Sequence, residues 1–325
     1  MFSHGLVFGK FMPVHAGHLA LIDFALKQCE RLTVSMSVTP DDPISPALRE
    51  RWLRALLADR PGVEVVVVDD DFHDPALPLY EATKSWARFI RQRFPDVDAF
   101  FCSEAYGAPL SEHLQRPCIL FDPQRVGVPV SATQIRTHPY RYWEFIPVVV
   151  RPYFTKRVCL YGPESVGKTT TGRQLADHYQ TAFVHEVARD LITDNAFSLD
   201  DIVKIGHAQS QAVLQAMERA NKVLICDTDV ITTGLYSEIY LNEVPPVLAE
   251  LEAQVPYDLY FLLDIDVPWV ADGLRDLGHR RQEMFDRFKA ALDRRNIAYV
   301  RVSGDWATRW QTLTDAIDAL LEAGF

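Results

Sequence analysis

Two glycine-bearing segments of this 325-residue chain have the residue types and spacing of phosphate-binding loops. Residues 9–18 read Gly-Lys-Phe-Met-Pro-Val-His-Ala-Gly-His and follow the apolar run 6–8. Residues 162–169 read Gly-Pro-Glu-Ser-Val-Gly-Lys-Thr and follow the apolar run 158–161. Either segment alone indicates nucleotide binding, and together they predict two ATP-using steps on one chain.

The first segment has the groups needed for nucleotidyl transfer. His15 and His18 lie three residues apart at the mouth of an expected helix, where free N–H groups and the helix dipole favour an anion. We expect both imidazoles and Lys10 to be catalytic, stabilising a pentavalent phosphorus and a leaving pyrophosphate while one phosphate attacks another directly. Gly9 would let the backbone approach a phosphate closely, and Phe11 is expected at the same ATP site.

A second set of donors occurs much later, in residues 130–136. Ser131 and Thr133 form a hydroxyl pair at an expected helix start, and Arg136 follows one turn later. These side chains suit the β- and γ-phosphates of ATP. The alternative is that Ser131 is an ordinary helix cap and the two histidines are loop residues.

Residues 162–169 match the P-loop pattern GxxxxGK[ST], whose backbone N–H groups cradle phosphates. We expect Lys168 to bridge β- and γ-phosphate oxygens and Thr169 to ligate Mg²⁺. Asp227 ends the apolar run 223–226 and is expected to be the second Mg²⁺ anchor, unless it lies in a solvated turn. Further ATP contacts are expected from Gly162, Glu164, Ser165, Gly167 and Thr170.

Two side chains after the P-loop helix are candidates for handling the acceptor. The Glu186 carboxylate is expected to accept a proton from the acceptor hydroxyl or to hold it, with Arg189 beside it. A surface salt bridge between the two is the alternative. Asp229 is expected to bind the same substrate.

The stretch 272–281 is rich in arginine and flanked by glycine. It suits a lid that brings Arg275 and Arg280 over the transferring phosphoryl group as further ATP-binding residues. A solvated loop is the alternative.

Strand and helix patterns alternate around these groups and predict an α/β protein of two domains. Expected strands are residues 6–8, 32–38, 63–68, 99–102, 158–161, 182–185, 223–226, 259–263 and 299–302. Expected helices are residues 17–30, 45–57, 80–94, 168–179, 199–221, 280–295 and 306–322. We therefore expect a Rossmann-like nucleotidyltransferase parallel sheet in residues 1–154 and a P-loop kinase parallel sheet in residues 155–325.

Composition excludes several other classes of protein. The net charge is −11, and neither half has the basic excess of a nucleic-acid-binding protein. No apolar run approaches the roughly 20 residues of a membrane span, and no signal peptide is visible. The five cysteines are scattered without a CxxC pair, which predicts reduced thiols and a cytoplasmic protein. A homo-oligomer stays open.

The motifs and their order resemble the NadR-type bifunctional enzymes, in which nicotinamide mononucleotide (NMN) adenylyltransferase is joined to ribosylnicotinamide kinase. The resemblance is strongest from 121 to 169 and continues in 186–189, 226–229 and 266–275. Because the first motif begins within ten residues of Met1, we expect no helix-turn-helix domain and no repressor role. Ala132, Val166 and Thr171 differ from the residues common at those positions.

This resemblance implies NAD salvage with ATP as co-substrate and Mg²⁺ as cofactor. The small-molecule partners would be ATP, NMN, ribosylnicotinamide and NAD. Because the motifs report only on the ATP side, the same two chemistries on another nucleoside or phosphate acceptor are an alternative. A nucleotide-sensing protein with one inactive domain is a third reading, and it would not need Lys168, Thr169, Asp227, His15 and His18 together.

Overall fold

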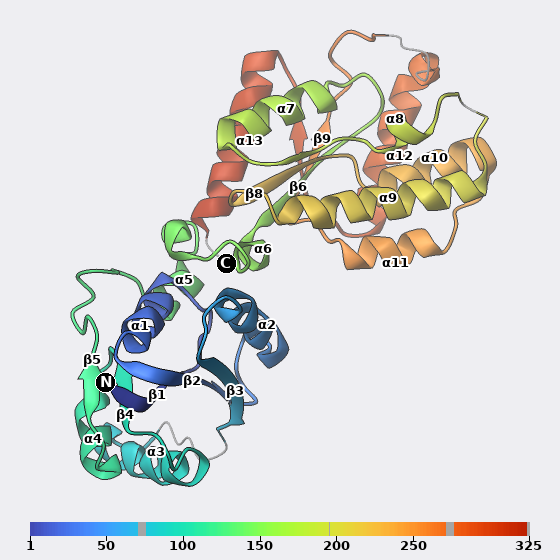
Figure 1. Ribbon diagram of the computed structural model, residues 1–325. Helices are drawn as coiled ribbons and strands as arrows, with labels where there is room; N and C mark the ends of the chain where they lie inside the picture. The colour runs from blue at the N-terminus through green and yellow to red at the C-terminus, as the bar shows by residue number, and fades with distance from the viewer. Residues whose placement is uncertain (71–75, 195, 271–275, 324–325) are drawn as a thin grey trace. The chain divides into compact units, whose positions relative to one another are not determined.

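The computed structural model describes residues 1–70, 76–194, 196–270 and 276–323. It divides into two compact units, Met1–Val150 and the residues from Arg151 onward, and each is described by itself (Figure 1). The division falls between Pro147 and Pro152, shortly before the expected boundary at residue 154. Each unit is built on one five-stranded sheet whose neighbouring strands are parallel. The predicted fold class is thereby confirmed.

The N-terminal unit alternates strands and helices. Its elements are β1 (Phe2–Gly9), α1 (Ala16–Leu26), β2 (Cys29–Val38), α2 (Pro46–Leu57), β3 (Val63–Asp69), α3 (Leu79–Arg93), β4 (Ala99–Cys102), α4 (Gly107–Leu114), β5 (Cys118–Leu120), α5 (Ala132–Thr137) and the 3₁₀ turn η1 (Trp143–Phe145). The strand order is β3-β2-β1-β4-β5. The chain runs outward from β1 to β3 and then returns to the other side of β1. Such a reversal opens a crevice at the carboxyl ends of the strands, where Gly9 lies.

The C-terminal unit repeats this plan with a different strand order. Its elements are α6 (Arg151–Phe154), β6 (Lys156–Tyr161), α7 (Lys168–Tyr179), β7 (Phe183–Val184), α8 (Ala188–Leu191), α9 (Leu199–Met217), β8 (Val223–Asp227), α10 (Val230–Leu241), α11 (Val247–Gln254), β9 (Leu259–Leu263), the 3₁₀ turn η2 (Leu277–Arg280), α12 (Arg281–Arg294), β10 (Tyr299–Val302) and α13 (Trp306–Glu322). The order β10-β9-β6-β8-β7 puts β6 at the centre, between β8 and β9. The P-loop leaves the carboxyl end of this strand.

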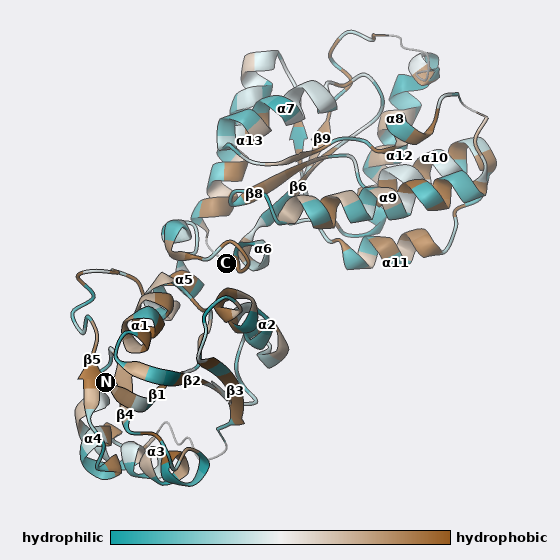
Figure 2. Ribbon diagram, in the orientation of Figure 1, coloured by the Kyte–Doolittle hydropathy of each residue, from teal (hydrophilic) through white to brown (hydrophobic). Residues whose placement is uncertain are grey.

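Side chains of β6 show how both faces of the second sheet are buried. Val158 and Leu160 pack with α7 and α13, whereas Cys159 and Tyr161 pack with α10 and α12. Because side chains alternate along a strand, a strand covered on both faces must be apolar throughout. Figure 2 shows hydrophobic stretches along β6 and β8. Among the described residues, no helix is both long and apolar enough to cross a membrane.

The elements differ from the sequence prediction at a few places. Helix α1 ends at Leu26 rather than near residue 30, because β2 already begins at Cys29. The prediction omitted α4, β5, α6, α8, α10 and α11. Helix α10 begins Val-Ile-Thr-Thr, and β-branched residues have low helix propensity. The Asp229 carboxylate caps this helix by accepting the Thr232 N–H at 2.9 Å, and packing against the sheet stabilises the rest.

Candidate active sites

Backbone N–H groups hold both histidines of the first motif. His15 is the N-cap of α1, and its Nδ1 accepts from the Gly17 N–H at 3.1 Å. The Nδ1 of His18 accepts from the His15 N–H at 3.3 Å, which completes a reciprocal capping box. With Nδ1 used as acceptor, a neutral imidazole carries its proton on Nε2. Both rings therefore keep an N–H donor for a ligand.

Both imidazoles are neutral in this environment. The rings lie with their centroids 3.8 Å apart. Burial first, and then the nearby Arg125 guanidinium, lowers the pKa of His18 to about 3. The pKa of His15 is also strongly lowered, by burial first and then by His18 and Arg125. The two side chains can therefore donate hydrogen bonds to a phosphate without bringing positive charge of their own.

Lys10 is held at the edge of the same loop by a buried ion-pair network. Its ammonium donates to the Asp42 carboxylate at 2.8 Å and to the Thr39 hydroxyl at 3.1 Å. The fully buried Arg49 donates to Asp42 at 2.7 Å and to the Lys10 carbonyl at 2.6 Å. The catalytic role of Lys10 stays a prediction, and the structure shows what positions the side chain.

The late motif joins the early one at an open cleft of about 1360 Å³. Ser131 caps α5, accepting from the Gln134 N–H at 3.2 Å, and Arg136 donates to the Met12 carbonyl of the first loop and to Thr133. The helix-cap alternative for Ser131 is therefore present, and its phosphate contact stays a prediction. Of the predicted residues, the cleft is lined by Gly9, Lys10, Phe11, His15, His18, Ser131, Thr133 and Arg136.

Sequence reasoning missed Arg125, which lines this cleft between the two motifs. It donates to the Val130 carbonyl at 2.6 Å and to the Glu104 carboxylate at 2.5 Å. Its charge lowers the pKa of both histidines. The only signal in the sequence was its place five residues before Val130, where it lies within the segment of family resemblance.

An aromatic pocket adjoins the first loop and was also missed. It shares Phe8, Gly9, Lys10 and Tyr106 with the cleft described above. Its other walls include Trp86, whose ring meets Phe8 and Tyr106 edge to face at centroid distances of 6.1 and 5.5 Å. The cleft and the aromatic pocket therefore adjoin at the first loop, where Gly9 and Lys10 line both.

The P-loop of the second unit has the backbone geometry that its glycines allow. Gly162 and Gly167 have φ of 140° and 92°, and a Cβ on Gly162 would lie 2.9 Å from the Leu263 carbonyl. Lys168 opens α7, and its ammonium donates to the carbonyls of Gly162 and Pro163, both at 2.8 Å. The Lys168 side chain thus bends back over the P-loop and contacts its backbone.

Thr169 and Asp227 meet where a metal is expected. The Thr169 hydroxyl donates to Asp227 Oδ2 at 2.5 Å. Asp227 is fully buried, and its Oδ1 has no hydrogen-bond partner among the described residues. Burial raises its pKa, and Lys168 opposes that shift. Two oxygen groups, one of them a buried carboxylate with a spare oxygen, suit Mg²⁺, which takes its remaining ligands from water and phosphate.

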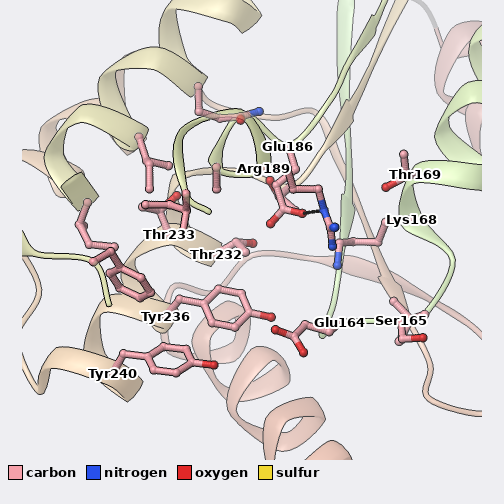
Figure 3. A pocket seen from close by; sticks show the side chains of 18 of the residues that line it. Glu164, Ser165, Lys168, Thr169, Glu186, Arg189, Thr232, Thr233, Tyr236 and Tyr240 are labelled. Atoms are coloured by element: carbon pink, nitrogen blue, oxygen red, sulfur yellow. Dashed lines mark hydrogen bonds and ion pairs between the residues drawn. The ribbon is translucent and has the colours of Figure 1, made fainter. Parts of the chain in front are cut away.

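A pocket of about 1100 Å³ opens beside the P-loop (Figure 3). Glu186 lines it and accepts from Arg189 at 3.0 Å, so the predicted pair is present as an ion pair inside the pocket rather than at a remote surface. Sequence reasoning missed much of the remaining wall, which includes Phe197, Gln209, Thr232, Thr233, Tyr236 and Tyr240. Gln209 is 2% exposed, and its Nε2 has no partner in the described part of the chain. A polar residue in the buried stripe of α9 was the available signal.

Several predicted residues of the second unit lie elsewhere. Both Asp229 oxygens are used inside the fold, by Thr232 and by the Tyr260 hydroxyl at 2.9 Å, and Asp229 does not line the pocket. Arg280 is paired with Glu283 on α12 and is likewise absent from the pocket wall. Arg275 and the rest of 271–275 lie outside the described residues.

The other predicted P-loop contacts surround the pocket or support the loop. Glu164, Ser165, Gly167 and Thr170 line the pocket, and Ser165 accepts from the Val270 N–H at 2.7 Å. Thr228, also in the pocket wall, has φ of 71°, which is rare for a β-branched residue. No cluster of three or more His, Cys, Asp or Glu suited to a metal occurs within the ranges that the structure describes.

Comparisons with known proteins cover both units. A family model described as an AAA domain matches residues 157–309. The trifunctional NAD biosynthesis/regulator protein NadR of Escherichia coli is 33% identical over 322 residues, which are 92% of this chain and 78% of that protein. The Salmonella typhimurium protein of the same name is 31% identical over the same shares. A nicotinamide-nucleotide adenylyltransferase of Thermococcus kodakarensis is 26% identical over 142 residues, 42% of this chain and 72% of that protein.

Solved structures share the whole fold. The crystal structure of a NadR protein in complex with NR has a TM-score of 0.79 at 24% identity, covering 100% of this chain and 96% of that one. A second, of NadR protein in complex with NAD and AMP-PNP, has a TM-score of 0.77 at 24% identity, covering 99% and 96%.

Proposed function

The chain belongs to the NadR family of NAD biosynthesis proteins, and from this membership we propose that it makes NAD from ribosylnicotinamide in two ATP-dependent reactions. The C-terminal unit phosphorylates ribosylnicotinamide to NMN. The N-terminal unit transfers AMP from ATP to NMN and releases pyrophosphate. One observation carries the proposal: each unit has its own phosphate-binding loop at the first strand of its sheet, with an adjoining pocket for a second substrate.

In the kinase reaction the 5′-hydroxyl oxygen of the riboside attacks the γ-phosphorus of ATP. The bond from the γ-phosphorus to the bridging oxygen breaks, and ADP leaves. Glu186 lines the acceptor pocket and takes the hydroxyl proton. Lys168 exchanges its two loop carbonyls for β- and γ-phosphate oxygens, where its charge stabilises the transition state.

Thr169 and Asp227 would hold Mg²⁺ in this unit, through the hydroxyl and the buried carboxylate. Bound there, the ion would supply positive charge that offsets the charge developing on the transferring phosphoryl group. Asp227 is rigidly placed for that purpose because it ends the buried strand β8.

In the adenylyltransferase reaction a phosphate oxygen of NMN attacks the α-phosphorus of ATP. The bond to the oxygen that bridges the α- and β-phosphates breaks, and pyrophosphate leaves. No protein nucleophile is needed. The Nε2–H groups of His15 and His18 donate to the phosphate oxygens, and the pyridine ring of NMN enters the aromatic pocket beside Trp86.

The cysteines bear on the cellular compartment of the enzyme. All five cysteines lie within the described ranges, and all are free thiols. Free thiols are typical of reducing compartments, and we place the enzyme in the cytoplasm.

The test is to follow both reactions with the purified protein by chromatography. Ribosylnicotinamide with ATP and Mg²⁺ should give NMN, ADP and then NAD with pyrophosphate. NMN supplied directly should give NAD and pyrophosphate without ADP. Phosphorylation of a different nucleoside in preference to ribosylnicotinamide would change the acceptor, and nucleotide binding without either product would contradict both activities.

A further inference from the structure

Glu164 is a P-loop residue whose side chain belongs to the acceptor pocket. It lies between Gly162 and Lys168 in the sequence and lines the pocket with Tyr236 and Tyr240. Figure 3 shows its carboxylate directed toward the Tyr236 hydroxyl. Phosphate binding by a P-loop uses backbone N–H groups and the lysine, so a carboxylate there has no part in it and repels the phosphates.

The other charged groups of this pocket have partners inside the protein. Glu186 is paired with Arg189, and Lys168 donates to two carbonyls. Asp276, outside the pocket wall, accepts from the Tyr240 hydroxyl. Glu164 has no ion-pair partner among the described residues, and its Oε2 is buried with no hydrogen-bond partner there. A ligand that supplies positive charge would complete this site.

Burial makes the ionised form of Glu164 costly while the pocket is empty. Burial raises the pKa of this carboxyl to about 7, Asp276 and Glu186 also raise it, and Lys168 and the Leu277 N–H oppose the shift. The charged or titratable groups facing it come from several elements: Lys168 of α7, Glu186 after β7, Arg189 of α8, Tyr236 and Tyr240 of α10 and Asp276 before η2.

Aromatic rings form the neighbouring wall. Tyr236 and Tyr240 stand one turn apart on α10 with their rings nearly parallel, at a centroid distance of 6.3 Å and an angle of 25°. Phe197 meets Tyr240 edge to face at 5.4 Å. Aromatic faces next to a carboxylate form a binding site for a flat organic cation.

We propose that Glu164 is the specificity-determining residue of the kinase site and selects an acceptor whose base carries a fixed positive charge. This inference rests on the proposed function, because the pyridinium ring of ribosylnicotinamide has such a charge and the bases of common nucleosides do not. Glu164 would therefore act on the acceptor and not on ATP, where the sequence had placed it.

The test compares two ribosides that differ in charge. Ribosylnicotinamide is cationic, and benzamide riboside is a neutral molecule of nearly the same shape. Binding of each is measured by titration calorimetry, without ATP, to the wild-type protein, to Glu164→Gln and to Glu238→Gln. Glu238 is a matched control, because it lies on α10 between the two tyrosines but does not line the pocket.

We expect Glu164→Gln to weaken binding of ribosylnicotinamide by about 10- to 100-fold and to change binding of benzamide riboside by less than about threefold. Glu238→Gln should change neither. ADP affinity, measured in parallel, should be the same in all three proteins. Equal losses for both ribosides, a loss confined to ADP, or no loss would each overturn the role of Glu164.

The pH dependence gives a second readout. Because the cation favours the ionised carboxylate, wild-type affinity for ribosylnicotinamide should rise about tenfold between pH 6 and pH 8, given a pKa of about 7. Binding should release a proton near pH 7, and Glu164→Gln should abolish both effects. A flat wild-type profile would contradict the proposal.

Turnover separates this inference from the proposed function. Charge-selective binding without phosphorylation would support the role of Glu164 and contradict the kinase activity. Phosphorylation of both ribosides with equal kcat/KM would keep the kinase and overturn the role of Glu164. No binding of ribosylnicotinamide by the wild-type protein would overturn both.

Discussion

The two units each place a phosphate-binding loop after the central strand of a parallel sheet, but they fill the loop with different chemical groups. In the N-terminal unit the side-chain donors at the loop are His15 and His18, whose pKa values are lowered so that both imidazoles are neutral. In the C-terminal unit the donor is Lys168, next to the buried carboxylate of Asp227. The N-terminal loop thus presents neutral imidazole donors, whereas the C-terminal loop presents a cation.

The difference extends to the surrounding residues. The cations of the N-terminal cleft already have partners: Lys10 bonds Asp42, Arg125 bonds Glu104, and Arg136 bonds the Met12 carbonyl. They hold the loops in place as well as providing positive charge. Lys168 bonds only neutral carbonyls among the described residues, so it can move to a phosphate without leaving a buried carboxylate unpaired. We therefore expect preorganised donors to stabilise transition-state charge in the N-terminal unit and a cation that changes partners, Lys168, to do so in the C-terminal unit.

Loss of the mobile cation should have the largest effect. Lys168→Ala removes the charge that bridges the β- and γ-phosphates, and we expect phosphorylation to fall on the order of 10²-fold or more. Adenylyl transfer from supplied NMN should be unchanged. The rates of NMN formation from the riboside and of NAD formation from NMN, measured separately, would show both results. A collapse of both activities in a folded variant would mean that the two sites are not separate.

Removal of a neutral donor should have the next largest effect, in the other unit. We expect His18→Ala to lower the adenylyltransferase kcat by about 10²-fold with a much smaller rise in the KM for ATP, because the donor acts on charge that develops in the transition state. Kinase activity should stay at the wild-type level. Steady-state kinetics of NAD formation measure this, and near-normal NAD formation would reduce His18 to its role in the capping box.

Short motifs and strands were predictable because they depend on local sequence. The P-loop spacing fixes its geometry within eight residues, and a buried parallel strand such as β8 is apolar throughout. Groups that tertiary contacts assemble were not predictable. Arg125 reaches His18 from more than a hundred residues away, and the buried Arg49 fixes Lys10 through Asp42. No local pattern encodes those pairs.

The sequence also gave no indication of the pocket wall beside the P-loop, for a related reason. Tyr236 and Tyr240 lie on α10, where buried residues are spread over the first two turns and give no clear one-sided pattern. Ser131 shows a different limit, because a residue with a local role as helix cap also suited an ATP-binding interpretation, and sequence alone does not separate the two roles. The sequence thus predicted the residues of the two phosphate-binding loops, whereas it did not point to the residues of the pocket walls beside them.

A third test asks whether the charges of the kinase site act through a metal. We expect Asp227→Asn to lower phosphorylation by about 10- to 100-fold and extra Mg²⁺ to restore part of the loss, because the carboxylate places the ion. Glu186→Gln is the matched carboxylate-to-amide change, and its loss should resist Mg²⁺ and depend on pH if Glu186 accepts the proton. Kinetics over a Mg²⁺ series decide between the roles. Swapped behaviour would exchange the two assignments.

The smallest expected effect concerns the charge of His15 and His18. It tests whether the N-terminal unit uses neutral donors where the C-terminal unit uses a cation. Burial lowers the pKa of His18 to about 3 and that of His15 further, so neither ring should gain a proton between about pH 5.5 and 8. We expect their NMR signals to stay fixed over this range. Single His→Gln variants would assign the signals. A midpoint near 6.5, the ordinary value, would mean that the imidazoles become cations at neutral pH or slightly below, and the N-terminal site would then work by charge as the P-loop does.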